Sequence, residues 1–198
     1  MPGHKLQVIR GLNNCRQQHQ NGVITIGNFD GLHLGHQKML EKMYSEASRL
    51  NTHSCLMTFE PLPREYFSRD DASSSRLMSR IEKIRTLGDF EDSLRPDYLL
   101  FLKFDRSLAA MSAVEFIERV LIEKLKIRAV IVGDDFRFGC DRKGDFGLLS
   151  DYGHKYGFSV SSIESHCIDD HRVSSSLIRD ALINDQLERT DRMLGRAY

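Results

Sequence analysis

The fold is decided by the stretch Thr25-Ile26-Gly27-Asn28-Phe29-Asp30-Gly31-Leu32-His33-Leu34-Gly35-His36. An apolar run typical of a β-strand, residues 23–26, leads into it, and a helical pattern over residues 37–50 follows it. A strand, a glycine-rich turn and a helix N-terminus form an anion site, because unpaired backbone N–H groups and the positive end of the helix dipole point into the turn. The stretch therefore predicts a phosphate-binding turn.

Two histidines three residues apart strengthen this prediction. Their spacing places His33 and His36 on one face of the first helical turn. Gly31 and Gly35 have no β-carbon, so a phosphate group can approach the backbone closely. An Asp-Gly pair alone is usually only a turn, and a single histidine is usually a solvated surface residue. Their combination between a strand and a helix is what indicates a functional site.

Composition excludes several classes of protein. The 198 residues suit one large α/β domain, residues 1–198, and a hydrophobic content of 40% is enough for a core. A formal net charge of zero disfavours nucleic acid as a partner. No run approaches the roughly 18 apolar residues of a membrane helix, and the first residues lack the apolar region of a signal peptide. We therefore expect a cytoplasmic protein, a monomer or a weak oligomer, that does not bind membranes.

The cysteines give no sign of a metal site or a disulfide framework. Their positions, Cys15, Cys55, Cys140 and Cys167, match no CxxC or zinc-type spacing. A domain of this length does not need disulfides for stability, so we expect free thiols in a reducing compartment. His33 and His36 are likewise not expected to be a metal pair, because no further ligand is placed to complete a site.

Strand and helix patterns alternate along the chain. Strands are expected over residues 5–10, 22–27, 53–59, 97–102, 129–132 and 158–163. Helices are expected over 37–50, from the capping boxes at Ser79 and Ser112, and over 146–157, 172–183 and 187–195. This alternation favours a Rossmann-like α/β fold, a parallel sheet with helices on both faces, with room for a small excursion subdomain. The glycine pattern is not GxGxxG, which disfavours a dinucleotide oxidoreductase.

The apolar faces of two of these helices can be predicted by residue. The helix after Ser79 carries the apolar residues Ile81, Ile84 and Leu87. After Ser112 the buried face should hold Val114, Ile117, Leu121 and Leu125.

Three segments between the predicted strands and helices have a distinctive amino-acid composition. Glu60-Pro61-Leu62-Pro63 is a stiff segment expected to lack regular structure, and it is either a ligand wall or a simple turn. The loop over 133–145 holds Phe136 and Phe138 in a polar setting, which suits either packing on the core or an apolar wall for a flat ring. The polar residues 68–76 are expected to form a mobile loop.

A run of hydroxyl side chains lies near the start of the helix expected over residues 172–183. Ser174, Ser175 and Ser176 exceed what one N-cap requires, so the surplus hydroxyl groups can bind phosphate oxygens at a helix N-terminus. Arg179 lies one turn further on and can reach the same anion.

The chain resembles the HxGH nucleotidyltransferases, and more narrowly the N-terminal module of bacterial FAD synthetases, the bifunctional riboflavin kinase/FMN adenylyltransferases. The resemblance runs from end to end and rests on five motifs in order: TIGNFDGLHLGH (25–36), TFEPLPREYF (58–67), LMSRIEKIRTL (77–87), VGDDFRFG (132–139) and SSSLIR (174–179), with LGRAY (194–198) at the end. Ser176 replaces the threonine of the family's SSTxxR signature and keeps the hydroxyl group. Ala197 replaces a proline.

The resemblance implies roles for particular residues. The catalytic group would be His33, His36, Ser175, Ser176 and Arg179. ATP would be bound by Gly27, Asn28, Phe29, Asp30, Gly35 and Gly133. FMN would be bound by Phe59, Pro61, Pro63, Asp135, Phe136, Arg137 and Phe138. Mg²⁺ would be held through the phosphates rather than by protein ligands.

The implied reaction transfers AMP from ATP to FMN, giving FAD and pyrophosphate. Another phosphorylated metabolite could be the acceptor, and a non-catalytic flavin or nucleotide module is the alternative from another class. The phenylalanine-rich loop favours a flavin, and the two histidines and Arg179 favour catalysis. The family continues into a riboflavin kinase module that these residues do not include, so no kinase activity is expected from them.

Overall fold

A single parallel sheet forms the body of the molecule. The computed structural model describes residues 5–68 and 76–198, which leaves the greater part of the expected 68–76 loop outside the described residues. Six strands lie in the order β1-β4-β3-β2-β5-β6, and every neighbouring pair is parallel. Their bounds are β1 Gln7–Arg10, β2 Val23–Ile26, β3 Ser54–Glu60, β4 Tyr98–Lys103, β5 Ala129–Gly133 and β6 Ser159–Ile163. The predicted Rossmann-like α/β sheet is confirmed.

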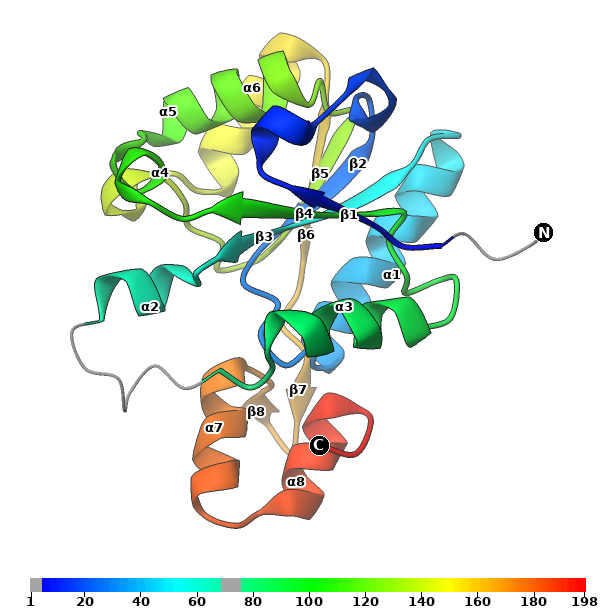
Figure 1. Ribbon diagram of the computed structural model, residues 1–198, viewed down its shortest axis with the longest axis vertical. Helices are drawn as coiled ribbons and strands as arrows, with labels where there is room; N and C mark the ends of the chain where they lie inside the picture. The colour runs from blue at the N-terminus through cyan, green and yellow to red at the C-terminus, as the bar shows by residue number, and fades with distance from the viewer. Residues whose placement is uncertain (1–4, 69–75) are drawn as a thin grey trace.

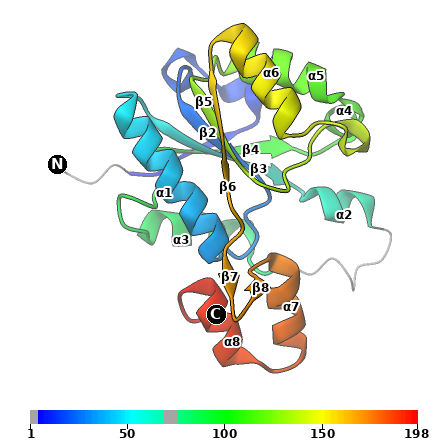
Figure 2. The same cartoon turned by 180° about the vertical axis from the view of Figure 1, so that it is seen from behind.

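Helices cover both faces of this sheet (Figures 1 and 2). Alternate residues of a strand point to opposite faces, and β2 follows this rule. Val23 packs in one core cluster with side chains of α1 (Leu34–Arg49) and α3 (Arg80–Asp89). Ile24 and Ile26 pack in the other, with side chains of the π-helix η4 (Phe116–Lys124) and of α6 (Phe146–Tyr156). Because both faces are buried, β2 is apolar almost throughout rather than alternating.

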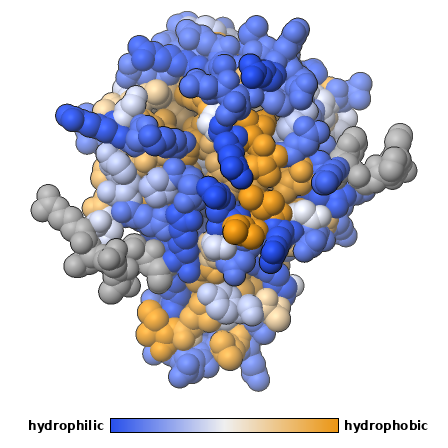
Figure 3. Space-filling model, viewed as in Figure 1, coloured by the Kyte–Doolittle hydropathy of each residue, from blue (hydrophilic) through white to orange (hydrophobic). Residues whose placement is uncertain are grey.

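The C-terminal residues form a small lobe with a core of its own. It contains the hairpin β7 (Cys167–Ile168) and β8 (His171–Arg172), and the helices α7 (Ser175–Ile183) and α8 (Leu187–Leu194). Leu77, from the main body, joins the lobe's apolar core. Apolar surface is visible on the lobe in Figure 3, where Ile183 and Leu187 are exposed. This lobe is the small subdomain that the sequence left room for.

Hydrogen bonds from Gln37 and Arg196 help to fasten the lobe to the turn after β2. Gln37 donates from Nε2 to the carbonyl oxygens of Leu32 (2.9 Å) and Leu194 (2.8 Å). Arg196 donates from Nη2 to the carbonyl oxygen of Gly31 at 2.6 Å. The lobe therefore meets the main body at the glycine-rich turn.

Several boundaries and faces differ from the predictions. Helix α1 begins at Leu34 because His33, not a later residue, is the N-cap. Pro63 does not exclude regular structure: it begins the short helix α2 (Pro63–Phe67), where the missing N–H costs nothing. Residue 172 belongs to β8, and α7 begins only at Ser175.

In each of these two helices one of the apolar residues picked out from the sequence is exposed. Ile81 is 59% exposed, and Lys83 is buried beside Leu87 instead. Val114 is exposed, while Phe116 and Val120 are buried with Ile117 and Leu121, because the helix changes from α5 (Ala113–Glu115) to the wider π-helix.

Short elements fill the remaining connections. These are the 3₁₀ turns η1 (Leu12–Asn14), η2 (Gln17–His19) and η5 (Cys140–Arg142), and the helix α4 (Arg106–Ala110). All four cysteines are free thiols, as expected. Among the described residues, no helix combines the length and the apolar character that crossing a membrane requires.

Candidate active site

The turn between β2 and α1 has an unusual backbone. Phe29 and Leu32 have positive φ angles of 46° and 47°, which non-glycine residues rarely adopt. Gly31 has φ 88°, and a β-carbon there would lie 2.8 Å from Leu77 Cδ1. The reason for this glycine is therefore its backbone angle and its packing against Leu77. The expectation that Gly31 gives a phosphate access to the backbone is not supported, because Gly31 does not line the cavity beside the turn.

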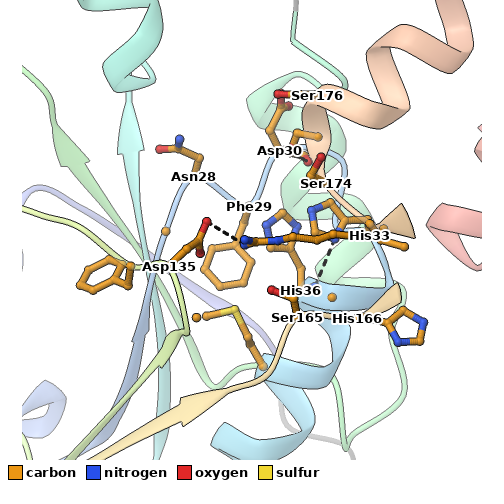
Figure 4. Close-up of a pocket in the computed structure, with 18 of the residues that line it drawn as sticks. Asn28, Phe29, Asp30, His33, His36, Asp135, Ser165, His166, Ser174 and Ser176 are labelled. Atoms are coloured by element: carbon orange, nitrogen blue, oxygen red, sulfur yellow. Dashed lines mark hydrogen bonds and ion pairs between the residues drawn. The ribbon is translucent and has the colours of Figure 1, made fainter. Parts of the chain in front are cut away.

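The two histidines stack against each other at the start of α1. Their ring centroids are 3.6 Å apart, and the His36 ring also packs on Phe29 at 4.7 Å. The backbone N–H of His36 donates to His33 Nδ1 at 3.3 Å, as the dashed line in Figure 4 shows. Because Nδ1 accepts this bond, the proton of a neutral His33 must lie on Nε2. His33 is therefore set up as an Nε2–H donor.

Both histidines are neutral near pH 7. Burial lowers the pKa of His33 to about 4, and the positive charges of Arg172 and Arg196 add to the effect. Burial also holds the pKa of His36 well below its usual range, helped by His33 and Lys83. The Nδ1 atom of His36 is buried, and within residues 5–68 and 76–198 it has no hydrogen-bond partner.

Asp30 is the centre of a buried hydrogen-bond network. Its Oδ2 accepts from Arg64 at 2.9 Å and from Arg179 at 2.7 Å. Its Oδ1 accepts from the backbone N–H groups of Leu77 (3.0 Å) and Met78 (3.3 Å). The carboxylate, only 3% exposed, thus joins the turn to α2, to α7 and to the residues that precede α3, and it orients two arginines.

The serines of the lobe lie directly against this network. Ser174 is the N-cap of α7 and accepts from the N–H of Leu177. Ser175 donates from Oγ to the carbonyl oxygen of Asp30 at 2.8 Å. Ser176 is exposed and takes part in lining the cavity. One hydroxyl of the three therefore caps the helix, one joins the lobe to the turn, and one faces the open space.

An ion pair spans the site from the lobe to the loop after β5. Arg172 of β8 lies 2.7 Å from Asp135 and 3.8 Å from Asp134. Asp134 in turn accepts from the N–H and the hydroxyl group of Ser165. The positive charge of the Arg172 guanidinium also lowers the pKa of His33.

The first of two cavities lies over these groups. It has a volume of about 650 Å³ and opens at the carboxyl ends of the strands, where parallel sheets bind ligands. Every residue predicted to be catalytic or to bind ATP lines it: His33, His36, Ser175, Ser176, Arg179, Gly27, Asn28, Phe29, Asp30, Gly35 and Gly133.

The second cavity, of about 590 Å³, adjoins the first and is richer in aromatic side chains. Phe136 and Phe138 stack with centroids 5.3 Å apart, and Phe59 packs edge-on against Phe104. Six of the seven residues predicted to bind FMN line this cavity: Phe59, Pro63, Asp135, Phe136, Arg137 and Phe138. Pro61 lines neither cavity.

Several lining residues had no sequence signal strong enough to select them. Arg64 and Arg172 line the first cavity, and Phe67, Phe104 and Met111 line the second. Arg64 sits in the motif 58–67, and Arg172 lies two residues before the serines, so nearness to a motif was the available clue. Phe104 directly follows β4 and Met111 directly follows α4, and the place of β4 beside β3 is set by the strand order.

Fold and site together define a Rossmann-like protein of the nucleotidyltransferase type. A solved structure from Streptococcus pneumoniae, described as a macrolide-efflux protein, matches 96% of this chain and 61% of its own chain, with a TM-score of 0.82 and 21% sequence identity. At that identity the likeness shows the fold alone.

Comparison with sequence relatives identifies the family of this chain within that class of protein. The model of the FAD synthetase family matches residues 15–177, and the chain belongs to that family. Bifunctional riboflavin kinase/FMN adenylyltransferases from Haemophilus influenzae and Pseudomonas fluorescens are each 40% identical over 193 residues, and that of Escherichia coli K12 is 41% identical over 194. Each match covers 98% of this chain and 60% or 61% of the relative, so the chain spans about three fifths of their length. The expected resemblance is confirmed.

Proposed function

We propose that this chain transfers the adenylyl group of ATP to FMN, giving FAD and pyrophosphate. The observation that carries the proposal is the pair of adjoining cavities. One is polar, with the histidines, the serines and a helix N-terminus, and the other is aromatic. They share the wall residues Ile26, Gly27, Asn28, Arg64, Asp135, Phe136 and Arg142. A nucleoside triphosphate and a flavin can thus lie side by side.

The reaction makes a modest demand on the protein. A phosphate oxygen of FMN forms a bond to the α-phosphorus of ATP, and the bond from that phosphorus to the β-phosphate bridge oxygen breaks. The terminal phosphate of FMN is already close to doubly charged at pH 7, since its second pKa is about 6, so no general base is needed. Catalysis then rests on positioning and on neutralising the charge that develops.

The histidines would act as neutral hydrogen-bond donors rather than as cations. His33 presents its Nε2–H group because its Nδ1 accepts from the backbone. A neutral donor costs no desolvated charge in the buried site, and it remains neutral across the working pH range. We assign the positive charge that stabilises the negative phosphates instead to Arg179 and to the positive end of the dipole of α1.

Ser175, Ser176 and Arg179 would hold the β- and γ-phosphates from the side of the lobe. Asp30, assigned above to ATP, would then act through Arg64 and Arg179 rather than by touching the nucleotide, since its carboxylate oxygens already accept four hydrogen bonds. Mg²⁺ would arrive with ATP and be bound chiefly by phosphate oxygens. In the described part of the chain, no three His, Cys, Asp or Glu side chains gather as metal ligands.

Other phosphorylated acceptors are the second candidate. The stacked pair of Phe136 and Phe138 favours a large flat ring over a flexible acceptor, because aromatic faces bind such rings by offset stacking.

The test is to mix the chain with FMN, ATP and Mg²⁺, follow flavin fluorescence, and separate the products by chromatography. FAD is dimmer than FMN because its adenine stacks on the flavin, and the chain has no tryptophan to interfere. A fall in fluorescence with an FAD peak supports the proposal. If FMN binds and no FAD forms, the proposal fails as stated. If FMN does not bind, the acceptor is wrong.

A further inference from the structure

Lys83 is a buried cation that the proposed reaction does not yet use. It lies on the inner face of α3 with only 4% of its surface exposed, although lysine is almost never fully buried without a partner of opposite charge. Its Nζ donates to the carbonyl oxygen of Asn28 at 2.7 Å and to the Thr58 hydroxyl group at 3.4 Å. Within the described residues both of these partners are neutral, so the charge has no direct counter-ion there.

The carbonyl group that Lys83 holds belongs to the active-site turn. Asn28 lines both cavities, and its carbonyl oxygen also accepts from Thr58 Oγ1 at 3.0 Å. The next residue, Phe29, has the positive φ angle of 46° and packs against the ring of His36. A backbone held in such a sparsely populated conformation needs firm contacts around it. Lys83 therefore sits at the start of a chain of contacts that ends on His36.

Charges on several neighbouring elements face this ammonium group. Asp30 of the turn, Glu60 of β3 and Glu65 of α2 favour its protonated form, and Arg76 opposes it. Burial outweighs them and lowers the pKa of Lys83 to about 8. Its charge also contributes to the lowered pKa of His36, which Lys83 reaches through the contacts of Asn28 and Phe29. A polyanion in the first cavity would supply the missing counter-charge.

We propose that Lys83 is a positioning residue for adenylyl transfer, which holds the Asn28 carbonyl and places a buried positive charge behind the triphosphate site. This inference rests on the proposed function. Below pH 8 the charged lysine stabilises bound ATP, and above it the unliganded protein loses that charge. Bound triphosphate favours the charged form, so ATP binding is linked to uptake of a proton by Lys83.

The variant test compares Lys83→Met with Arg85→Met, an exposed residue of the same helix. For Lys83→Met we expect kcat/KM for ATP at pH 7 to fall at least about tenfold, with the dissociation constant of FMN within about twofold of the wild type. In the wild type and in Arg85→Met, kcat/KM for ATP should fall as the pH rises past about 8, while kcat should fall only at higher pH. Lys83→Met should lack this alkaline fall. If it keeps wild-type kcat/KM and the same pH profile, the proposal is overturned.

A second measurement does not depend on a folded variant or on turnover. Calorimetry of MgATP binding to the wild-type chain at pH 8.5, in two buffers of different ionisation enthalpy, gives the protons taken up. We expect about half a proton per ATP. Binding of MgATP without proton uptake would refute the role of Lys83. A chain that takes up the proton yet forms no FAD would show that ATP binding is linked to the charge of Lys83, while the proposed adenylyl transfer, and with it the positioning role, fails.

Discussion

At the scale of single residues, the site depends on groups that are buried and yet polar. His36 lies between the rings of His33 and Phe29, and its pKa is far below neutral. Burial of this kind fixes the ring and its donor in place before the substrate arrives. That is the form of preorganisation from which electrostatic catalysis gains most.

Replacing His36 with alanine should reduce turnover far more than flavin binding. We expect kcat to fall by about 10²–10³, the usual loss when one preorganised donor is removed, with little change in the affinity for FMN. Steady-state kinetics and a fluorescence titration with FMN measure the two quantities. His154→Ala, an exposed histidine of α6, is the matched control. Undiminished turnover of the His36 variant would contradict the catalytic role assigned to His36.

The buried histidines should make the protein sensitive to acid. The unfolded chain binds a proton at His33 near the ordinary pKa of 6.5, whereas the folded chain does so only near 4. Stability is therefore fully present above about pH 6.5 and is lost as the pH falls towards 4. His33 alone should cost about 2 kcal/mol of unfolding free energy between pH 7 and pH 5. Urea unfolding at both pH values checks this, and a His33→Gln variant with the wild-type loss would contradict it.

Asp30 should matter for stability as well as for the site. In Asp30→Asn the amide can still accept from Leu77, but the charge that faces Arg64 and Arg179 is removed. Losing one partner of a buried ion pair costs about 3 kcal/mol, and chemical denaturation would measure it. Asp92→Asn breaks an exposed ion pair with Arg95 and should cost less than about 1 kcal/mol. Equal losses for the two variants would contradict the central place of Asp30.

At this scale the sequence allowed us to select residues that belong to motifs. It did not allow us to select residues whose contacts depend on how distant elements pack together. His33, His36 and Arg179 could be selected because their spacing places them at helix starts. Lys83 could not, since a lysine in a helical pattern is normally solvated and its burial depends on how α3 packs over the turn. Arg172 pairs with Asp135 across some forty residues, a contact that no local pattern contains.

At the scale of elements, the loop over 133–145 is held by a glycine that has no room for a side chain. Gly139 has φ 73°, and a β-carbon there would lie 2.5 Å from the backbone nitrogen of Ala113. Because that neighbour is backbone at the start of a helix, the loop rather than the helix would have to move. Phe138 and Gly139 both line the second cavity, so any such shift would deform it.

Gly139→Ala should therefore weaken FMN binding at least about tenfold and leave ATP binding nearly unchanged. Gly157→Ala is the control: its φ of 80° is equally unfavourable for alanine, but a β-carbon there meets nothing within 4 Å. That variant should lose only about 1 kcal/mol of stability from the backbone strain. Titrations with each substrate distinguish the two effects. Equal loss of FMN and ATP affinity in Gly139→Ala would contradict the division into two cavities.

The elements themselves could largely be predicted, because buried parallel strands are short apolar runs and the intervening helices carry caps. The errors have physical causes. Val114 was assigned to a buried face on a 3.6-residue period, whereas the helix widens to a π-helix directly after it. The hairpin β7–β8 has strands of two residues, which are too short to give an alternating pattern.

At the scale of the whole molecule, the site exists because the lobe returns to the first turn of the sheet. Ser175 reaches Asp30 over 145 positions of sequence, and Arg196 reaches Gly31 over 165. From the sequence we could predict the parallel sheet and the two segments that line the polar cavity, the turn after β2 and the start of α7. The strand order and the position of the lobe against the sheet depend on long-range packing. Monomeric or weakly associating behaviour in solution stays a prediction, which sedimentation can test.

The central claim is that these residues move an adenylyl group, and labelled ATP tests it most directly. The chain is incubated with FMN, Mg²⁺ and ATP carrying ³²P at the α-phosphate, and the products are separated. We expect the label in FAD, and in a parallel reaction with γ-labelled ATP we expect it in pyrophosphate. Label from the α-position that stays with ADP or AMP, while FAD remains unlabelled, would contradict adenylyl transfer by this site.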